Sequence, residues 1–115
     1  MAEKISKQQA LRHYKWGNNC DGWIFVDSEA LSVKQESMPA GTAEQLHYHQ
    51  KARQFFFILK GSATFEVEGQ TIEAAAGEGV SVMPSEKHRI INHTAEALEF
   101  ILCTQPSAAA DRINC

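Results

Sequence analysis

Short apolar or alternating runs, separated by glycine and proline, recur along the chain from residue 23 to residue 103. The runs lie at 23–26, 31–38, 53–59, 63–67, 71–75, 80–83, 88–92 and 98–103. They have the length and the β-branched or aromatic content of strands, and they recur roughly every ten residues with glycine in many of the turns. This rhythm predicts an all-β protein, built as a sandwich or an antiparallel barrel.

One segment near the N-terminus has a different pattern. Within residues 3–15, Ile5, Ala10, Leu11 and Tyr14 have the spacing of a helix face. We expect a helix there that lies outside the barrel.

The run from Phe55 to Leu59 is apolar on both faces of the strand that it predicts. Side chains alternate along a strand, so Phe56 and Ile58 share one face with Gln54, while Phe55, Phe57 and Leu59 share the other. A strand with one wet face would alternate polar and apolar residues instead. Another sheet or another subunit must cover the outer face. We therefore expect a homodimer, formed through sheet packing or exchanged N-terminal strands.

The composition is that of an ordinary globular chain, with 115 residues, 43% apolar residues and 22% charged residues. This length suits one domain. We expect a single domain over residues 1–115, with a barrel core at about 22–105, an N-terminal extension at 1–21 and a C-terminal tail at 106–115.

Charge and hydropathy argue against two classes of partner. The net charge is −3 and lysine and arginine do not cluster, so we expect no nucleic-acid binding. The longest apolar run, 55–59, is too short to cross a bilayer, so we expect no membrane partner. The N-terminus lacks the apolar segment of a secretion signal, and Cys20, Cys103 and Cys115 form no CxxC pair. These features predict a cytoplasmic protein with reduced thiols.

The candidate functional residues lie just before the aromatic run and at the start of a later strand. His47 and His49 stand one residue apart on a predicted strand, so both imidazoles can point into the interior. Gln54 opens the next strand and offers a carbonyl oxygen, and His88 begins a later strand after a turn at residues 84–87. An isolated HxH pair is more often a polar surface feature, but the addition of His88 and Gln54 favours a metal site. Three imidazoles and one amide oxygen would leave coordination positions open for water or substrate.

The spacing of these residues resembles the two motifs of the cupins, a family of small β-barrel proteins. The first motif, G(X)5HXH(X)3,4E(X)6G, is matched by GTAEQLHYHQKARQFFFILKG over residues 41–61, with Gln54 in place of glutamate. The second, G(X)5PXG(X)2H(X)3N, is similar to GEGVSVMPSEKHRIIN over residues 77–92, with Met83 for proline and Ser85 for glycine. Agreement of the spacing in both motifs is much more specific than a lone HxH pair.

The resemblance implies a fold and a ligand set. The fold would be the double-stranded β-helix, or jelly-roll barrel, of the cupins. The metal ligands would be His47, His49, Gln54 and His88, holding a divalent transition metal such as Ni, Zn, Fe or Mn, and Asn92 would be structural. The HxH(X)4Q pattern is similar to that of small cupins that open unsaturated uronates.

Three functions stay open from the sequence. The first is a metal-dependent enzyme that acts on a small anionic molecule, such as a sugar acid, through Lewis-acid chemistry. The second is a non-catalytic barrel that binds or senses a small ligand, and the third is a three-histidine dioxygenase. No catalytic acid or base is evident, although Glu36, Tyr48, Arg53 and Met83 are candidates to point inward.

Overall fold

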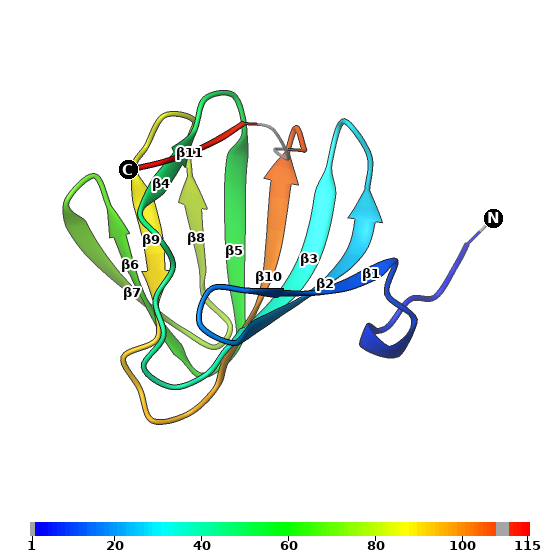
Figure 1. Cartoon of the computed structure of the whole chain (residues 1–115), viewed down its shortest axis with the longest axis horizontal. Helices are drawn as coiled ribbons and strands as arrows, with labels where there is room; N and C mark the ends of the chain where they lie inside the picture. The colour runs from blue at the N-terminus through cyan, green and yellow to red at the C-terminus, as the bar shows by residue number, and fades with distance from the viewer. Residues whose placement is uncertain (1, 108–110) are drawn as a thin grey trace.

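The computed structural model describes residues 2–107 and 111–115, and most of its regular structure is β-strand (Figure 1). A single short 3-10 helix, η1 (Lys7–Gln9), precedes the strands of this described part. The strands are β1 (Arg12–Trp16), β2 (Cys20–Asp27), β3 (Ser32–Met38), β4 (His47–His49), β5 (Arg53–Lys60), β6 (Ser62–Val67), β7 (Gln70–Ala75), β8 (Gly79–Val82), β9 (His88–Ile91), β10 (Leu98–Gln105) and β11 (Arg112–Asn114). Met1 of the expected extension and residues 108–110 of the expected tail lie outside the described residues.

Two antiparallel sheets face each other and enclose the core (Figure 1). The six-stranded sheet has the order β1-β2-β3-β10-β5-β8, and the five-stranded sheet has the order β11-β4-β9-β6-β7. The largest fully buried side chains include Phe56, Phe65, Phe100, Met38 and Ile58. The structure confirms the all-β prediction. Within residues 2–107 and 111–115, no helix combines the length and the apolarity needed to cross a membrane.

The prediction of a helix over residues 3–15 is wrong. Apart from the single turn of η1, the segment is extended, and β1 pairs antiparallel with β2. The connecting turn contains Gly17 and Asn19, whose φ angles are +52° and +62°. Glycine and asparagine accept positive φ most readily, so the hairpin had a turn signal of its own. The alternation of Tyr14 and Trp16 with polar neighbours fits β1 better than a helix face.

Both ends of the chain add strands beyond the expected barrel core of 22–105. β1 lies at the edge of the six-stranded sheet. β11, from the expected C-terminal tail, pairs with β4 and sets Arg112 opposite His49. The two edge strands are short, but each brings side chains to the interior of the barrel.

The two faces of β5 hold the residue sets that alternation predicts, but only one of the two faces is buried within this chain. Phe56 and Ile58 are fully buried between the sheets. Phe55, Phe57 and Leu59 point to the outside and remain 42%, 37% and 44% exposed. Large apolar side chains that alternate on one strand and stay exposed form a patch that calls for a cover.

Asn92 fixes the end of β9 through its side chain. The amide nitrogen donates to the backbone carbonyls of Met38, Pro39 and Glu96, at 3.0, 3.2 and 2.8 Å. The amide oxygen accepts from the backbone N–H and the hydroxyl of Thr94, at 3.0 and 2.7 Å. The side chain is fully buried, so its own amide groups have no water as a substitute partner. The structural role expected for Asn92 has a physical basis in these five contacts.

We expect Asn92→Ala to lower the free energy of unfolding by about 3 kcal/mol, because it leaves several buried backbone groups without partners. Urea denaturation followed by circular dichroism measures the change. Gln70→Ala, on the exposed start of β7, is the control and should change stability by less than about 0.5 kcal/mol. Equal effects of the two substitutions would contradict this role of Asn92.

Candidate metal centre

Three histidines from β4 and β9 meet on the inner face of the five-stranded sheet. His47 lies opposite His88 where the two strands pair, and their ring centroids are 4.3 Å apart. His49, two residues along β4, points to the same side. One ring nitrogen from each histidine lies within 4.8 Å of the others, and the three residues are only 1%, 6% and 1% exposed. The fold therefore brings together the histidines that the sequence singled out.

Burial keeps these imidazoles neutral. Removal from water lowers the pKa of His47 to about 3 and that of His49 to about 4, and it also lowers the pKa of His88. Nδ1–H of His47 donates to the carbonyl of Gln45, and Nδ1–H of His88 donates to the carbonyl of Glu86, each at 2.8 Å. Nε2 of both rings therefore carries a free lone pair. This is the form of histidine that binds a metal ion.

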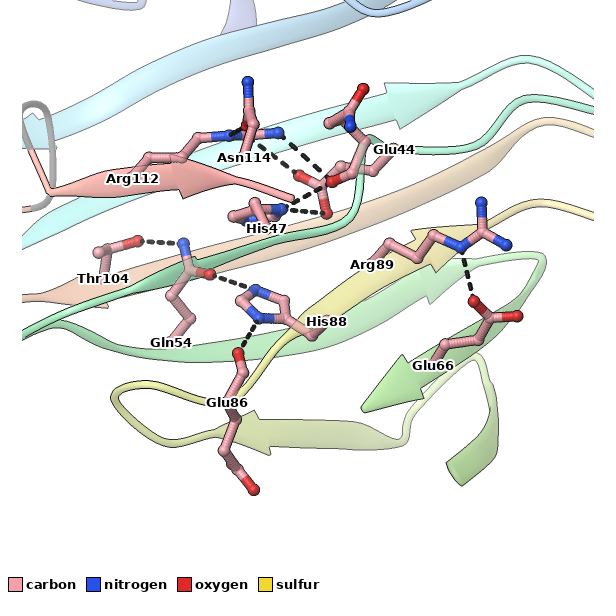
Figure 2. Close-up of polar contacts among 11 residues, drawn as sticks. Glu44, His47, Gln54, Glu66, Glu86, His88, Arg89, Thr104, Arg112 and Asn114 are labelled. Carbon is pink, nitrogen blue, oxygen red and sulfur yellow. Dashed lines mark hydrogen bonds and ion pairs between the residues drawn. The ribbon is translucent and has the colours of Figure 1, made fainter. Parts of the chain in front are cut away.

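Gln54 lies beside His88 with its oxygen toward the ring (Figure 2). Oε1 of Gln54 is 3.0 Å from Nε2 of His88, while its Nε2 donates to the hydroxyl of Thr104 at 3.1 Å. Since His88 uses its ring proton at Nδ1, two lone pairs face each other at this short distance. Two ligand atoms each about 2.1 Å from one ion, at a right angle, are about 3.0 Å apart. The pair fits two neighbouring ligands of a metal ion.

The ring of His49 also has a nitrogen that a metal ion could use. Nδ1 of His49 has no hydrogen-bond partner within the described residues. A buried polar atom without a hydrogen-bond partner lowers the stability of the fold. Coordination of a metal ion by either ring nitrogen of His49 would use that nitrogen's lone pair and fix the position of the ring proton. An amide of Gln54 turned over, with its NH2 toward His88, would satisfy that one pair without an ion but would leave His49 unchanged. The donor set as a whole therefore fits a divalent transition metal.

A cavity of about 370 Å³ borders two of the three histidines. Its wall includes His47, His49 and Gln54, and it extends along β3 and β10 to the side chains of β1. Six further charged side chains line it, namely Arg12, Lys34, Arg112, Asp27, Glu36 and Glu44. The cavity is large enough for a small organic molecule and carries both signs of charge.

Glu44 and Arg112 form a polar cluster against His47 (Figure 2). Nη1 of Arg112 lies 3.5 Å from Oε2 of Glu44, and Oε1 of Glu44 lies 3.8 Å from Nδ1 of His47. Burial raises the pKa of Glu44 to about 8, more than Arg112 lowers it. Glu44 could have been suspected from its place between Gly41 and His47. Arg112 gives no signal in the sequence, because only the pairing of β11 with β4 brings it here.

Asp111 ties the C-terminal strand to the loop that follows β4. Its carboxylate accepts hydrogen bonds from the backbone N–H groups of Gln50, Lys51 and Ala52, each at 3.0 Å. This loop joins His49 to the strand of Gln54. The three bonds therefore help to set the distance between two parts of the site.

Of the four residues considered as inward-pointing acids, bases or contacts, one reaches the cavity. Glu36 lines it from β3. Tyr48 alternates with the two histidines on β4, so its side chain points to the other face. Arg53 is exposed on the face of β5 opposite Gln54, and Met83 is 51% exposed after β8.

We expect the pH dependence of stability to reveal Glu44. Because its pKa is raised, the folded protein keeps a proton that the unfolded chain releases above about pH 4.5, so Glu44 destabilises the fold progressively as pH rises to about 8. In metal-free protein, the free energy of unfolding of Glu44→Gln minus that of the wild type should increase from pH 5 to pH 8. Urea denaturation at several pH values measures this difference.

Glu66→Gln is the control for this titration. Arg89 lowers the pKa of Glu66, so any effect of its charge is lost only as pH falls below about 4.5. The difference for Glu66→Gln should be constant from pH 5 to pH 8. A constant difference for Glu44→Gln as well would show that its carboxyl titrates normally.

Solved structures share the fold at low sequence identity. The polyketide cyclase RemF from Streptomyces resistomycificus superimposes with a TM-score of 0.82 at 13% identity, covering 99% of this chain and 85% of that one. KdgF from a Halomonas species gives a TM-score of 0.80 at 14% identity, covering 95% and 97%. These similarities show the fold alone.

Sequence comparison gives the family. An uncharacterized protein of Methanocaldococcus jannaschii is 24% identical over 75 residues, which are 65% of this chain and 60% of that protein. The chain thus spans less than two thirds of that relative's length. Residues 34–104, more than half of the chain, match the family described as the cupin domain. The protein belongs to the cupin family.

Proposed function

We propose that the protein binds a divalent transition metal through His47, His49, Gln54 and His88 and acts on a small anionic organic molecule. The observation that carries this proposal is the convergence of one ring nitrogen each from His47, His49 and His88 within 4.8 Å, beside a cavity of about 370 Å³. Oε1 of Gln54 lies 3.0 Å from Nε2 of His88 at the same place. A bound ion would supply Lewis-acid polarisation of a substrate oxygen. Four neutral ligands would leave its full positive charge, which attracts an anion such as hydroxide or a carboxylate.

The cavity wall supports an anionic substrate. Lys34 is half-buried on the inner face of β3, and its ammonium lies 5.7 Å from the centre of the Tyr14 ring. Within the described residues, Lys34 makes no ion pair with a carboxylate. A half-buried cation with no carboxylate within ion-pair distance is suited to receive a carboxylate from the ligand. The likeness of the HxH(X)4Q pattern to uronate-opening cupins leads us to propose a sugar acid as the substrate class.

We expect Gln54→Glu to keep the metal and to weaken carboxylate binding. Glutamate preserves the length and the ligand oxygen, but it adds a negative charge close to the ion, and unit charges about 4 Å apart interact by roughly 4 kcal/mol at an intermediate dielectric. Solvent and side-chain adjustment should reduce this to a loss of tenfold or more in affinity for acetate or galacturonate. Elemental analysis and isothermal titration calorimetry measure the two properties.

His88→Ala is the matched control for the same experiment. It should abolish stoichiometric metal and, with it, the metal-dependent binding of the carboxylate. Wild-type protein without metal, or Gln54→Glu with undiminished carboxylate binding, would contradict the proposed role of the site. The metal found also separates the hypotheses, since iron favours dioxygenase chemistry and nickel or zinc favours Lewis-acid chemistry.

We also propose that the outer face of the six-stranded sheet forms a homodimer. Phe55, Phe57 and Leu59 are exposed on β5, and burying one such side chain stabilises an assembly by roughly 1.5–3 kcal/mol. Phe57→Glu should therefore shift the protein toward monomer in light scattering at micromolar concentration, whereas Lys60→Glu, also exposed on β5, should not. A monomeric wild type would refute the dimer.

A further inference from the structure

A tyrosine and a glutamate meet inside the cavity, outside the histidine cluster. The hydroxyl of Tyr14 donates to Oε2 of Glu36. Tyr14 comes from β1 and Glu36 from β3, so the contact spans the strand β2 that lies between them. Both side chains line the cavity that His47, His49 and Gln54 also line.

Gly22 makes this contact possible. In the register of the sheet, Tyr14 lies opposite Gly22 on β2, and Gly22 lies opposite Glu36 on β3. A Cβ atom at Gly22 would lie 2.1 Å from the Tyr14 ring, well inside contact distance. The tyrosine ring therefore crosses over a residue that has no side chain, and its hydroxyl reaches the next strand. The three residues form one cross-strand row built around the glycine.

The two oxygens of Glu36 have different surroundings. Oε2 is held by Tyr14, while Oε1 has no hydrogen-bond partner within the described residues. Glu36 is 8% exposed, and it lines the cavity rather than the outer surface. One oxygen is anchored and the other is available to a molecule bound in the cavity. This is the arrangement that a proton-transferring carboxyl group needs, since the anchor fixes its orientation.

We propose that Glu36, oriented by Tyr14, is the residue that transfers a proton to and from a carbonyl-bearing acid bound beside the histidine cluster. The proposal rests on the proposed function, which supplies the anionic ligand. Glu36 would be the catalytic residue and Tyr14 a positioning residue that acts through it.

The proton transfer is balanced without a further reactant. The Glu36 carboxylate takes a proton from the carbon next to the carbonyl group, and the C–H electron pair forms a carbon–carbon double bond. The carbonyl π electrons move to the oxygen and give an enolate. The Glu36 carboxyl group then returns a proton to carbon, and the reverse electron shift restores the carbonyl group. An isomerase or a ring-opening enzyme can use the same steps at two different atoms.

The electrostatic surroundings suit this role. Burial raises the pKa of Glu36 above its ordinary value, and the opposing effects of the Tyr14 hydrogen bond and of the charges of Lys34 and Arg112 are smaller. Glu44 faces the same space, and the charge of Glu36 contributes to its raised pKa. A raised pKa brings a carboxyl group closer to the pH at which it can both release and accept a proton.

Pyruvate is a suitable probe, because it combines a carboxylate, a carbonyl group and exchangeable C–H bonds. The metal-loaded protein in deuterated buffer should replace the methyl protons of pyruvate with deuterium faster than buffer or free metal does, as followed by proton NMR. Glu36→Gln keeps the size of the side chain and an acceptor for Tyr14, and it should lower the exchange rate at least 100-fold. Metal content, pyruvate affinity and melting temperature should remain those of the wild type. Glu96→Gln, exposed and outside the cavity, should exchange like the wild type.

Tyr14→Phe provides a second test that a purely structural pair would not pass. It keeps the ring over Gly22 but removes the hydrogen bond that lowers the pKa of Glu36. The midpoint of the exchange rate against pH should therefore move to higher pH. A pH titration of metal-free protein with 13C-labelled glutamate, followed by carbon NMR at the Glu36 carboxyl carbon, should show a higher pKa in Tyr14→Phe than in the wild type. This readout is independent of activity.

The outcomes separate this inference from the proposed function. Pyruvate binding without exchange by the wild type, exchange by Glu36→Gln at the wild-type rate, or an unshifted pH midpoint in Tyr14→Phe would overturn the role of Glu36 alone. Absence of metal or of carboxylate binding would overturn the proposed function itself, and the role of Glu36 with it.

Discussion

Three imidazoles packed together away from water are held in the neutral form. Each then has a ring nitrogen whose lone pair needs a hydrogen-bond donor or a metal ion as its partner. In His47 and His88 the other ring nitrogen is satisfied in the same way, because each Nδ1–H donates to the carbonyl of the residue two positions earlier. That local bond directs both Nε2 atoms to the same region, where Oε1 of Gln54 also points (Figure 2). The geometry around the three rings follows from this shared constraint, and the donor atoms that converge there fit a metal ion.

The strand that carries two of these rings has little support of its own. β4 contains only His47, Tyr48 and His49, and it meets β9 at the single pair of His47 with His88. Three further pairs come from β11, at the far end of the chain, and Asp111 fastens the loop after β4 to the start of β11. The same short segment also delivers Arg112 to Glu44. The C-terminal residues thus contribute both to the support of β4 and to the charged groups of the cavity.

The sequence carried the parts of this site that depend on local spacing. Alternation along a strand is enough to place His47 with His49 and to put Phe56 and Phe55 on opposite faces of β5. It does not decide which face this chain buries, since Phe56 is 1% and Phe55 42% exposed. Arg112 and Tyr14 could not be found in this way, because their positions depend on which distant strands pair and in which register. The prediction of an N-terminal helix was wrong for a related reason. Four apolar residues fitted a helical period, but the turn at Gly17 and Asn19 and the pairing with β2 decided the structure.

Burial acts on the acids and on the histidines of the cavity in the same direction, toward neutrality. It lowers the pKa values of the three imidazoles and raises those of Glu36 and Glu44. Besides these two acids, three basic side chains, Arg12, Lys34 and Arg112, and one further acid, Asp27, line the cavity. A carboxylate at position 54 would add a negative charge beside the proposed ion, whereas glutamine adds none. The amide of Gln54 and the raised pKa values of Glu36 and Glu44 thus act in one direction. Both reduce the negative charge of the cavity, which favours an anion.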